Sequence, residues 1–246
     1  MRSYLSYGGG VNSTAMLVLL EREGWDFETV YVDHGCDWPE TRDYVLQIAK
    51  RFPITILTPE VEGCSNLYEY AWKHRMIPSR RVRWCTANFK VRVINDYVAR
   101  PCYMLIGFST DEAHRARFDY NDGIERRFPL LEYELDRADC VRIIKDAGLP
   151  VPMKSGCWFC PFQRKSQWRL LRQLHPDLFC KAQALEAREI AARAARGKGP
   201  LRLSDVPLVH VVSESQPALF SELQPPCLCE REPAGQLDLF AQGATT

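Results

Sequence analysis

The sequence predicts an α/β fold: a Rossmann-like parallel sheet with helices on both faces. Three observations predict it. Short β-prone apolar segments alternate with helical patterns, and such alternation is typical of parallel sheets. A glycine-rich turn joins the first strand to the first helix. The length of 246 residues suffices for one α/β domain and an appendage.

Each expected element follows from its local pattern. The first helix continues from the glycine turn as an almost unbroken apolar run, 15–20. Pro39 stands near the first turn of the second helix, and Gly148 follows the end of a later one. The expected strands are 4–7, 27–32, 54–57 and 103–107, and the expected helices are 15–23, 40–51, 137–147 and 182–196.

The turn at 6–14 indicates a phosphate site. Gly8, Gly9 and Gly10 let the backbone turn tightly and approach a ligand without a Cβ. Ser13 and Thr14 stand at the start of the next helix, where unpaired N–H groups and the helix dipole attract an anion. A glycine-rich turn without a ligand is the alternative.

The spacing of this turn narrows the class of site. No lysine precedes Ser13, which excludes a Walker loop, and the contiguous glycines exclude the dinucleotide fingerprint. The run 8–13 resembles the PP-loop of ATP pyrophosphatases, S-G-G-x-D-S. It departs at Gly8, where the motif has serine, and at Asn12, where it has aspartate.

Four further segments, in the same order, resemble the phosphoadenosine phosphosulfate (PAPS) reductase-like family of the adenine nucleotide α-hydrolase superfamily. The resemblance covers about 2–165 and implies a sheet that binds ATP or a related adenylate. The segments are Val32–Thr41 (D-T-G-x-x-x-P-E-T), Cys85–Lys90 (C-T-x-x-x-K), Gly107–Arg115 (G-x-x-x-D-E-x-x-R) and Phe128–Glu132 (Y-P-L).

The resemblance implies roles for individual residues. Asp33 would bind adenine, ribose or Mg²⁺, and Lys90 and Arg115 would neutralise phosphate charge. Asp111, with Glu112, would serve Mg²⁺ or pair with Arg115. Surface ion pairs are the alternative for all these charged residues. The phosphates would be held by Ser6, Gly8, Gly9, Gly10, Ser13 and Thr14.

A basic stretch follows the third strand. Residues 73–92 hold seven lysines and arginines, and no acidic residue lies between Glu69 and Asp96. Trp72, Trp84 and Phe89 are interleaved, a pattern that suits a nucleic-acid backbone and its bases. The stretch could equally bind only nucleotide phosphates or sulfate. The formal net charge of the chain is +1, which indicates a local patch.

Ten cysteines without a signal-peptide pattern point to metal or redox chemistry. Cys157 and Cys160 form a C-x-x-C followed by proline, an ending common beside iron–sulfur clusters. In the related adenylylsulfate reductases, a cysteine that matches Cys85 joins a distal C-x-x-C in a [4Fe–4S] cluster. The resemblance therefore implies a cluster on these three cysteines.

The fourth ligand is open. Cys229 or Cys227 could supply it, or the fourth iron could stay free, as in iron–sulfur RNA-thiolating enzymes. Zinc is the rival metal, because Cys157, Cys160, Cys227 and Cys229 would form a Cys₄ structural site.

The sequence suggests three parts. Residues 1–150 would form the PP-loop domain, 151–212 a largely helical appendage with the C-x-x-C, and 213–246 an extended or disordered tail. Gln236–Phe240 resembles the bacterial sliding-clamp-binding peptide; a chance match or docking on its own domain is the alternative.

Three functions compete. The first is an ATP-dependent, adenylating sulfurtransferase that acts on nucleic acid, with DNA favoured over tRNA and a cysteine desulfurase or other sulfur donor as partner. The second is an adenylylsulfate or PAPS reductase, although the usual C-terminal E-C-G-x-H is absent. The third is a non-catalytic, nucleotide-sensing DNA- or clamp-binding module. Neither a signal peptide nor a transmembrane run is expected, which predicts a cytoplasmic protein without membrane contact.

Overall fold

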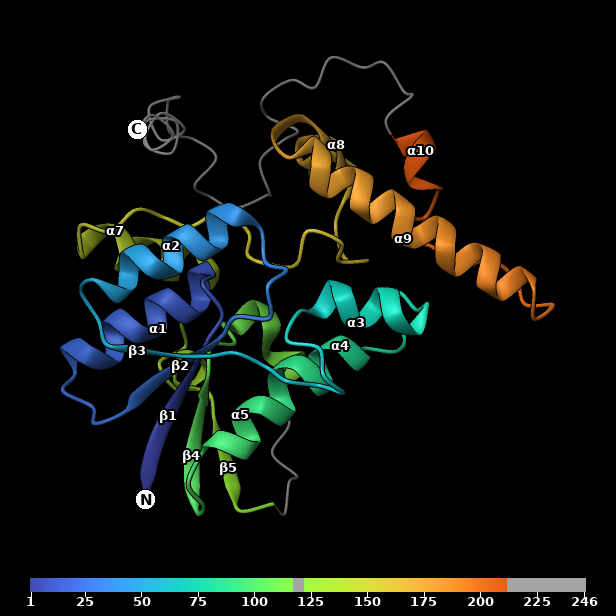
Figure 1. Cartoon of the computed structure of the whole chain (residues 1–246). Helices are drawn as coiled ribbons and strands as arrows, with labels where there is room; N and C mark the ends of the chain where they lie inside the picture. Colours follow the sequence, from blue (N-terminus) through green and yellow to red (C-terminus); the bar gives the residue numbers. More distant parts are fainter. Residues whose placement is uncertain (117–121, 212–246) are drawn as a thin grey trace.

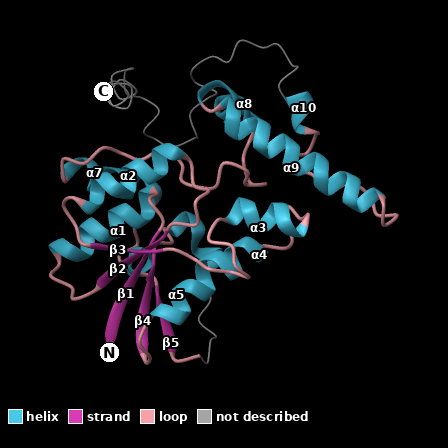
Figure 2. Cartoon of the chain, viewed as in Figure 1, coloured by secondary structure: helices cyan, strands magenta, loops and turns pink. Residues whose placement is uncertain are grey.

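The computed structural model describes residues 1–116 and 122–211. Its centre is a five-stranded sheet in the order β3-β2-β1-β4-β5, in which every neighbouring pair is parallel (Figures 1 and 2). The predicted α/β, Rossmann-like fold is confirmed. The strands are β1 (Arg2–Tyr7), β2 (Glu28–Val32), β3 (Ile54–Leu57), β4 (Cys102–Ile106) and β5 (Ile124–Arg127), the last of which the sequence did not suggest.

Side chains that alternate along the strands face two different layers. Leu5, Tyr31 and Leu105 pack against α1 (Val11–Arg22), α2 (Pro39–Ala49) and α7 (Arg137–Asp146). Tyr4, Val30 and Met104 pack on the opposite face, against Ile94 and Val98 in and after α5 (Arg92–Tyr97). Successive side chains of a strand point to opposite faces of the sheet, so neighbours such as Tyr4 and Leu5 lie in different apolar layers. Figure 1 shows α1, α2 and α7 together beside the sheet.

The remaining helices are short, apart from α8 (Lys165–Leu174) and α9 (Pro176–Ala194). The other elements are α3 (Leu67–His74), α4 (Trp84–Thr86), a π-helical turn η1 (Ala87–Val91), a 3₁₀ turn η2 (Thr110–Arg115), α6 (Pro129–Glu132) and α10 (Leu208–Val211). Among the described residues, no helix combines the length and the apolar character that crossing a bilayer requires.

One apolar cluster joins the C-terminal helices to the α/β part. Trp158, Trp168 and Phe179 share it with Trp38 and Phe89. The helical appendage expected at 151–212 is thus packed on the segment that contains α3 and α4. The expected tail 213–246, with Cys227, Cys229 and Gln236–Phe240, lies outside the described residues.

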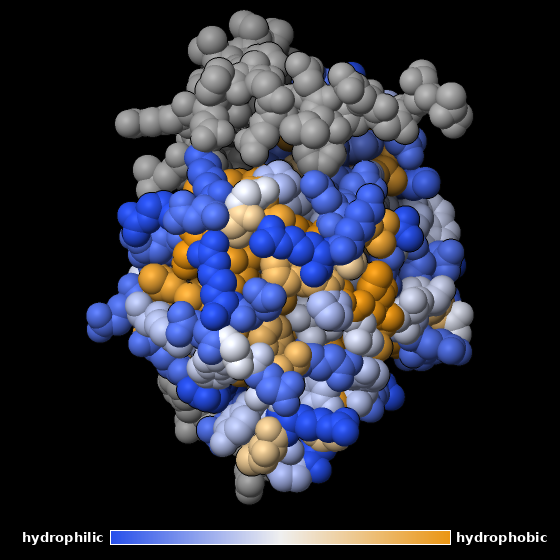
Figure 3. Space-filling model, turned by 90° about the vertical axis from the view of Figure 1, so that its left-hand side faces the viewer, coloured by the Kyte–Doolittle hydropathy of each residue, from blue (hydrophilic) through white to orange (hydrophobic). Residues whose placement is uncertain are grey.

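The strand order reverses at β1, which pairs with β2 on one side and with β4 on the other. The chain therefore crosses in one direction from β1 to β2 and β3, and in the opposite direction from β3 to β4 and β5. Ligands of open α/β sheets bind at this switch point. On the face that Figure 3 presents, long hydrophilic side chains lie over limited apolar patches.

Candidate functional site

The glycine turn closes on itself through Ser13. The Ser13 hydroxyl donates to the Gly10 carbonyl at 3.1 Å and accepts from the Gly8 N–H at 3.3 Å. Gly10 is the N-cap of α1 and provides no side-chain cap. The first N–H groups of α1 are therefore available to an anion at the positive end of the helix dipole.

Close packing requires glycine at positions 9 and 107, but not at position 8. A Cβ on Gly9, at φ +65°, would lie 2.8 Å from Val45 Cγ2. A Cβ on Gly107 would lie 3.2 Å from the backbone nitrogen of Ser13, which cannot move independently of α1. A Cβ on Gly8 would meet nothing within 4 Å, so the serine of the PP-loop motif would fit there.

These contacts predict opposite results for two small substitutions. Gly107→Ala is expected to displace the start of α1 and to weaken ATP binding about tenfold, since overpacking costs roughly 1–3 kcal/mol. Gly8→Ser is expected to fold normally and to bind ATP at least as tightly. Isothermal titration with ATP·Mg²⁺ measures both. Equal weakening by the two substitutions would contradict the packing argument.

Asn12 replaces the motif aspartate and connects three segments. Its Nδ2 donates to Glu112 Oε2 at 2.9 Å and to Ser109 Oγ at 3.1 Å, and its Oδ1 accepts from Arg137 Nη1 at 3.2 Å. Glu112 in turn pairs with Arg115. The guanidinium of Arg137 therefore lies beside the glycine turn, as a cation that sequence reasoning missed.

Several expected site residues have other partners. Thr14 is fully buried and its hydroxyl bonds Tyr7 Oη at 3.0 Å, so the structure does not bring that hydroxyl to the turn. Asp33, at the end of β2, accepts from Arg42 Nε at 3.0 Å and from the Gly35 N–H at 2.9 Å. Asp111 accepts from the Arg137 N–H, the first of α7. Ser6 is half-buried in β1.

A cavity of about 480 Å³ brings together most of the other expected residues. Cys85, Cys157 and Cys160 line it, together with Lys90 and Arg115. They come from α4, from η1, from η2 and from the loop before α8. The fold thus brings Cys85 and Cys160, which are far apart in the sequence, to the wall of one cavity.

Backbone pairing holds the C-x-x-C loop beside the end of β2. The Trp38 N–H donates to the Gly156 carbonyl and the Trp158 N–H donates to the Cys36 carbonyl, both at 3.0 Å. Asp37 and Cys157 form the bridge between these two segments. Trp38 and Trp158 are buried in the shared apolar cluster, which keeps the pairing in place.

Lys90 and Asp37 form the charged pair of the cavity. Lys90 Nζ lies 3.8 Å from Asp37 Oδ1, and Tyr31 Oη donates to Asp37 Oδ2 at 2.7 Å. Burial opposes ionisation of Asp37, but Lys90 and His34 outweigh it and hold the pKa of that carboxyl well below its usual range. Burial would lower the pKa of Lys90, but Asp37 and the three cysteines raise it. Both groups are therefore charged at neutral pH.

His34, Asp37 and Cys157 offer a second possible donor set for a metal, with one atom each within 4.8 Å of one another. However, His34 Nδ1 accepts the Cys36 N–H at 3.2 Å, so the proton of the neutral ring is on Nε2. Nε2 lies 3.4 Å from Asp37 Oδ1 and 3.6 Å from Cys157 Sγ. A metal-bound histidine normally donates from its other nitrogen. This arrangement therefore suits a hydrogen-bond donor between Asp37 and Cys157 better than a metal ligand.

The three cysteines of the cavity offer thiol ligands on its wall, although only Cys157 belongs to the described group of ligand atoms within 4.8 Å of one another. All three are free thiols. Burial raises the pKa of both Cys157 and Cys160, and Asp37 raises that of Cys157 further, whereas Lys90 lowers both. Uncompensated thiolates are costly in such a cavity, and metal coordination removes that cost. Outside it, Cys36, Cys64, Cys102 and Cys140 are buried and Cys180 is exposed.

The phosphate turn and the cavity adjoin. Ser155 lines the cavity, and its Oγ would lie 2.7 Å from a Cβ on Gly10. On the other side, Asn12 contacts Glu112, which pairs with Arg115 at the cavity wall. Lys154 also lines the cavity, and burial lowers the pKa of its amine. A nucleotide bound at the glycine turn would therefore lie next to the side chains that line the cavity.

Comparison with known proteins agrees with this architecture. Residues 2–127 match the family described as the phosphoadenosine phosphosulfate reductase domain. The uncharacterized protein MJ0973 of Methanocaldococcus jannaschii is 24% identical over 193 residues, which cover 72% of this chain and 45% of that protein. The uncharacterized protein MJ0066 of the same organism is 23% identical over 215 residues, with 79% and 43% covered. The chain thus spans less than half the length of these relatives.

A solved structure with the same fold is the phosphoadenylyl-sulfate reductase of Candida auris in its phosphate complex. It superposes with a TM-score of 0.51 at 17% identity, over 64% of this chain and 82% of that one. At this identity the likeness concerns the fold.

Proposed function

Since the chain belongs to the phosphoadenosine phosphosulfate reductase domain family, we propose that it is an ATP-dependent enzyme that adenylates its substrate and transfers sulfur to nucleic acid. The observation that carries this proposal is the contact between the phosphate turn and the three-cysteine cavity through Ser155. A non-catalytic, nucleotide-sensing module would need the phosphate turn but not the three-cysteine cavity. The combination of a phosphate turn and an adjoining thiol-rich cavity supports activation by ATP followed by sulfur transfer.

The adenylation step assigns work to residues around the turn. A substrate oxygen attacks the α-phosphorus of ATP·Mg²⁺, the bond from that phosphorus to the bridging oxygen breaks, and pyrophosphate leaves with the electron pair. The N–H groups at the start of α1 bind the phosphates. Lys90, Arg115 and Arg137 neutralise the charge that develops on the phosphate oxygens. Asp33, which follows β2, and Asp111, in η2 after β4, would serve Mg²⁺.

Cys85, Cys157 and Cys160 would hold a [4Fe–4S] cluster, with Cys227 or Cys229 or an open position as the fourth ligand; zinc is the alternative metal. When bound, the cluster supplies a site that carries sulfur. His34 Nε2 lies 3.6 Å from Cys157 Sγ, and Lys90 supplies a positive charge near all three sulfurs. The buried aromatic side chains of the apolar cluster keep water away from one side of the cavity.

The proposed partners are nucleic acid, with DNA ahead of tRNA, and a cysteine desulfurase or other sulfur donor. The peptide Gln236–Phe240 supports DNA, because it resembles a sliding-clamp ligand. Deletion of residues 236–240 is expected to abolish capture by a bacterial sliding clamp without changing ATP chemistry. Retained capture would show that the resemblance is accidental.

The decisive test is the position at which ATP is cleaved. With nucleic acid, a sulfur donor and ATP labelled on the α-phosphorus, we expect the label first on the adenylated nucleic acid and then in AMP, which leaves when sulfur displaces it; pyrophosphate is the unlabelled co-product. Arg115→Ala should slow their formation about 100-fold, because it removes charge at the reacting phosphate. Arg142→Ala, a matched surface change on α7, should not. Release of γ-phosphate alone would overturn the proposal.

A reductase that acts on adenylylsulfate or its 3′-phosphate is the second candidate, and membership of the family favours it. The described part of the chain places three cysteines in the cavity but assigns none of them as a separate nucleophile. Sulfite formed from adenylylsulfate with thioredoxin, without ATP, would support this candidate over sulfur transfer.

A further inference from the structure

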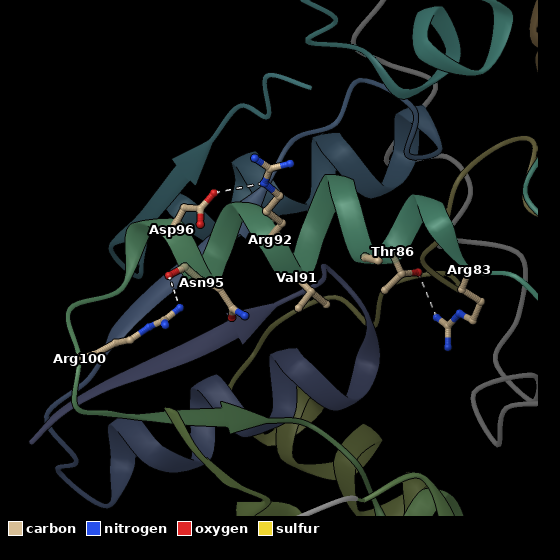
Figure 4. Close-up of a pocket in the computed structure, with 8 residues that line it drawn as sticks. Arg83, Thr86, Val91, Arg92, Asn95, Asp96 and Arg100 are labelled. Carbon is tan, nitrogen blue, oxygen red and sulfur yellow. Dashed lines mark hydrogen bonds and ion pairs between the residues drawn. The ribbon is translucent and has the colours of Figure 1, made fainter. Parts of the chain in front are cut away.

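A second hollow lies on the outer side of α4, η1 and α5 (Figure 4). Its volume is about 500 Å³. Three arginines line it, Arg83, Arg92 and Arg100. In Figure 4, Arg92 lies on the same side of the helix as Asp96, and Arg83 and Arg100 lie towards the two ends of the helical segment. The other lining residues are Thr86, Ala87, Val91, Asn95 and Asp96.

This arginine groove adjoins the cysteine cavity. Arg83 and Thr86 line both hollows. Arg83 Nη2 donates to Thr86 Oγ1 at 3.3 Å, so the two side chains form a shared wall. A ligand that extends from the groove to the cysteines would therefore pass over Arg83 and Thr86.

The charge of the groove suits a polyanion. Residues 70–110 hold eight lysines and arginines and one acidic residue, Asp96, in a chain with a net charge of +1. Asp96 lies 3.6 Å from Arg92, but both side chains are about 70% exposed, so this pair is weak and can exchange for a phosphate. Arg100 Nη2 donates to the Asn95 carbonyl, which uses one of the five N–H groups of its guanidinium.

An exposed aromatic side chain stands where the groove meets the cavity. Phe162 is 46% exposed and lines the cavity. The guanidinium carbon of Arg83 lies 5.6 Å from the centre of its ring. Arg80 Nε donates to the Pro161 carbonyl at 3.0 Å, which fixes the backbone beside the ring. An aromatic ring beside a guanidinium is a platform on which any nucleobase can stack.

The dimensions favour one strand over a duplex. Arg83 and Arg92 are nine residues apart, roughly 13 Å along the helical segment, a span that several phosphates can follow. The cavity, at about 480 Å³, has the size of a site for one small ligand. Enzymes that modify a nucleotide in such a pocket act on single strands or extrude the nucleotide from the stack.

We propose that a single nucleic-acid strand lies along the arginine groove and enters the cysteine cavity over Phe162. This inference rests on the proposed function, in which nucleic acid is the substrate. The backbone phosphates contact Arg92, Arg100 and Arg83, and the base that precedes the reacting nucleotide stacks on Phe162.

The test measures binding without ATP. The full chain, purified under anaerobic conditions, is titrated against a fluorescent single-stranded DNA and against the duplex of the same sequence. We expect the single strand to bind more tightly. Arg92→Glu and Arg100→Glu should each weaken it about tenfold or more and lower the salt slope by about one. Phe162→Ala should weaken the single strand about tenfold and the duplex little.

The control is Arg142→Glu on α7. Arg142 is 72% exposed and pairs with Asp139 on its own helix, as Arg92 is 69% exposed and pairs with Asp96. We expect its affinity for DNA to stay within about twofold of the parent, since only the groove contacts phosphates. Equal losses for Arg92→Glu and Arg142→Glu, a preference for the duplex, or unchanged binding by Phe162→Ala would each overturn the proposal.

The outcomes separate this proposal from the proposed function. Binding as expected together with release of γ-phosphate alone would keep the strand path and remove adenylation. Pyrophosphate release without any DNA binding would keep adenylation and remove the path. Circular dichroism of each variant verifies the fold, which these exposed side chains should not affect.

Discussion

Cys157→Ala is expected to eliminate iron and sulfide from the anaerobically purified protein and to abolish sulfur transfer. The parent should show a broad band near ~400 nm and roughly four irons per chain. Cys157 lies in the cavity that Cys85 and Cys160 also line, and its sulfur is the one next to His34. Its loss removes one of the three cysteines that line the cavity, and the proposed cluster needs all three. Absorption spectra with iron, sulfide and zinc assays measure this effect.

Cys180→Ala is the matched control, because Cys180 is exposed on α9 and does not line the cavity. Its metal content should equal that of the parent. A colourless parent with about one zinc per chain would show a structural site instead. Unchanged iron in Cys157→Ala would remove the cavity as the cluster site.

Lys90→Met is expected to destabilise the fold by roughly 2–4 kcal/mol and to stop adenylation. The side chain of Asp37 is 3% exposed, so the substitution leaves its carboxylate buried without its cation. Lys90 itself is 35% exposed, towards the cavity, which places the effect at the lower end of that range. Urea unfolding and pyrophosphate release measure the two losses separately.

The double variant Lys90→Met with Asp37→Asn separates stability from catalysis. Without the negative charge, most of the lost stability should return, whereas adenylation should stay absent because the ammonium group of Lys90 no longer faces the phosphates. Recovery of both would assign Lys90 a purely structural role. Lys198→Met, in the turn that follows α9, is the control and should change neither quantity.

Local patterns predicted the parts of the fold that depend on near neighbours. The alternation of strand and helix, and the glycine run between β1 and α1, were sufficient for the sheet and for the phosphate turn. The polar strand Ile124–Arg127 was missed because its sequence, IERR, has no apolar period. The π-helical turn that contains Lys90 has no sequence signature either.

The candidate site was predictable where a motif carries its chemistry. Cys85, Lys90, Arg115 and the C-x-x-C were expected from their motifs, and the structure places all of them around one cavity. What remained hidden depends on distant contacts: Arg137 reaches the turn through Asn12, 125 residues away in sequence.

His34 and Asp37 were hidden for a different reason. They stand in a segment whose resemblance draws attention to Asp33, and only the bridge between Asp37 and Cys157 reveals which side chains face the cysteines. Conversely, the hydroxyl of Thr14 was expected at the turn, but the first turn of a helix presents successive side chains to different sides, and this one faces the core.

Most of the wall of the cysteine cavity comes from three stretches of chain, around 34–38, 78–90 and 154–167, with Leu67 and Arg115 in addition. The apolar cluster that joins these stretches also includes Leu208 and Val211. During synthesis, the sheet can be complete while the last helices are still inside the ribosome. The cavity is then incomplete, because Gln167 of its wall lies in α8. The enclosure of the cysteines therefore depends on packing that the C-terminal part of the chain supplies last.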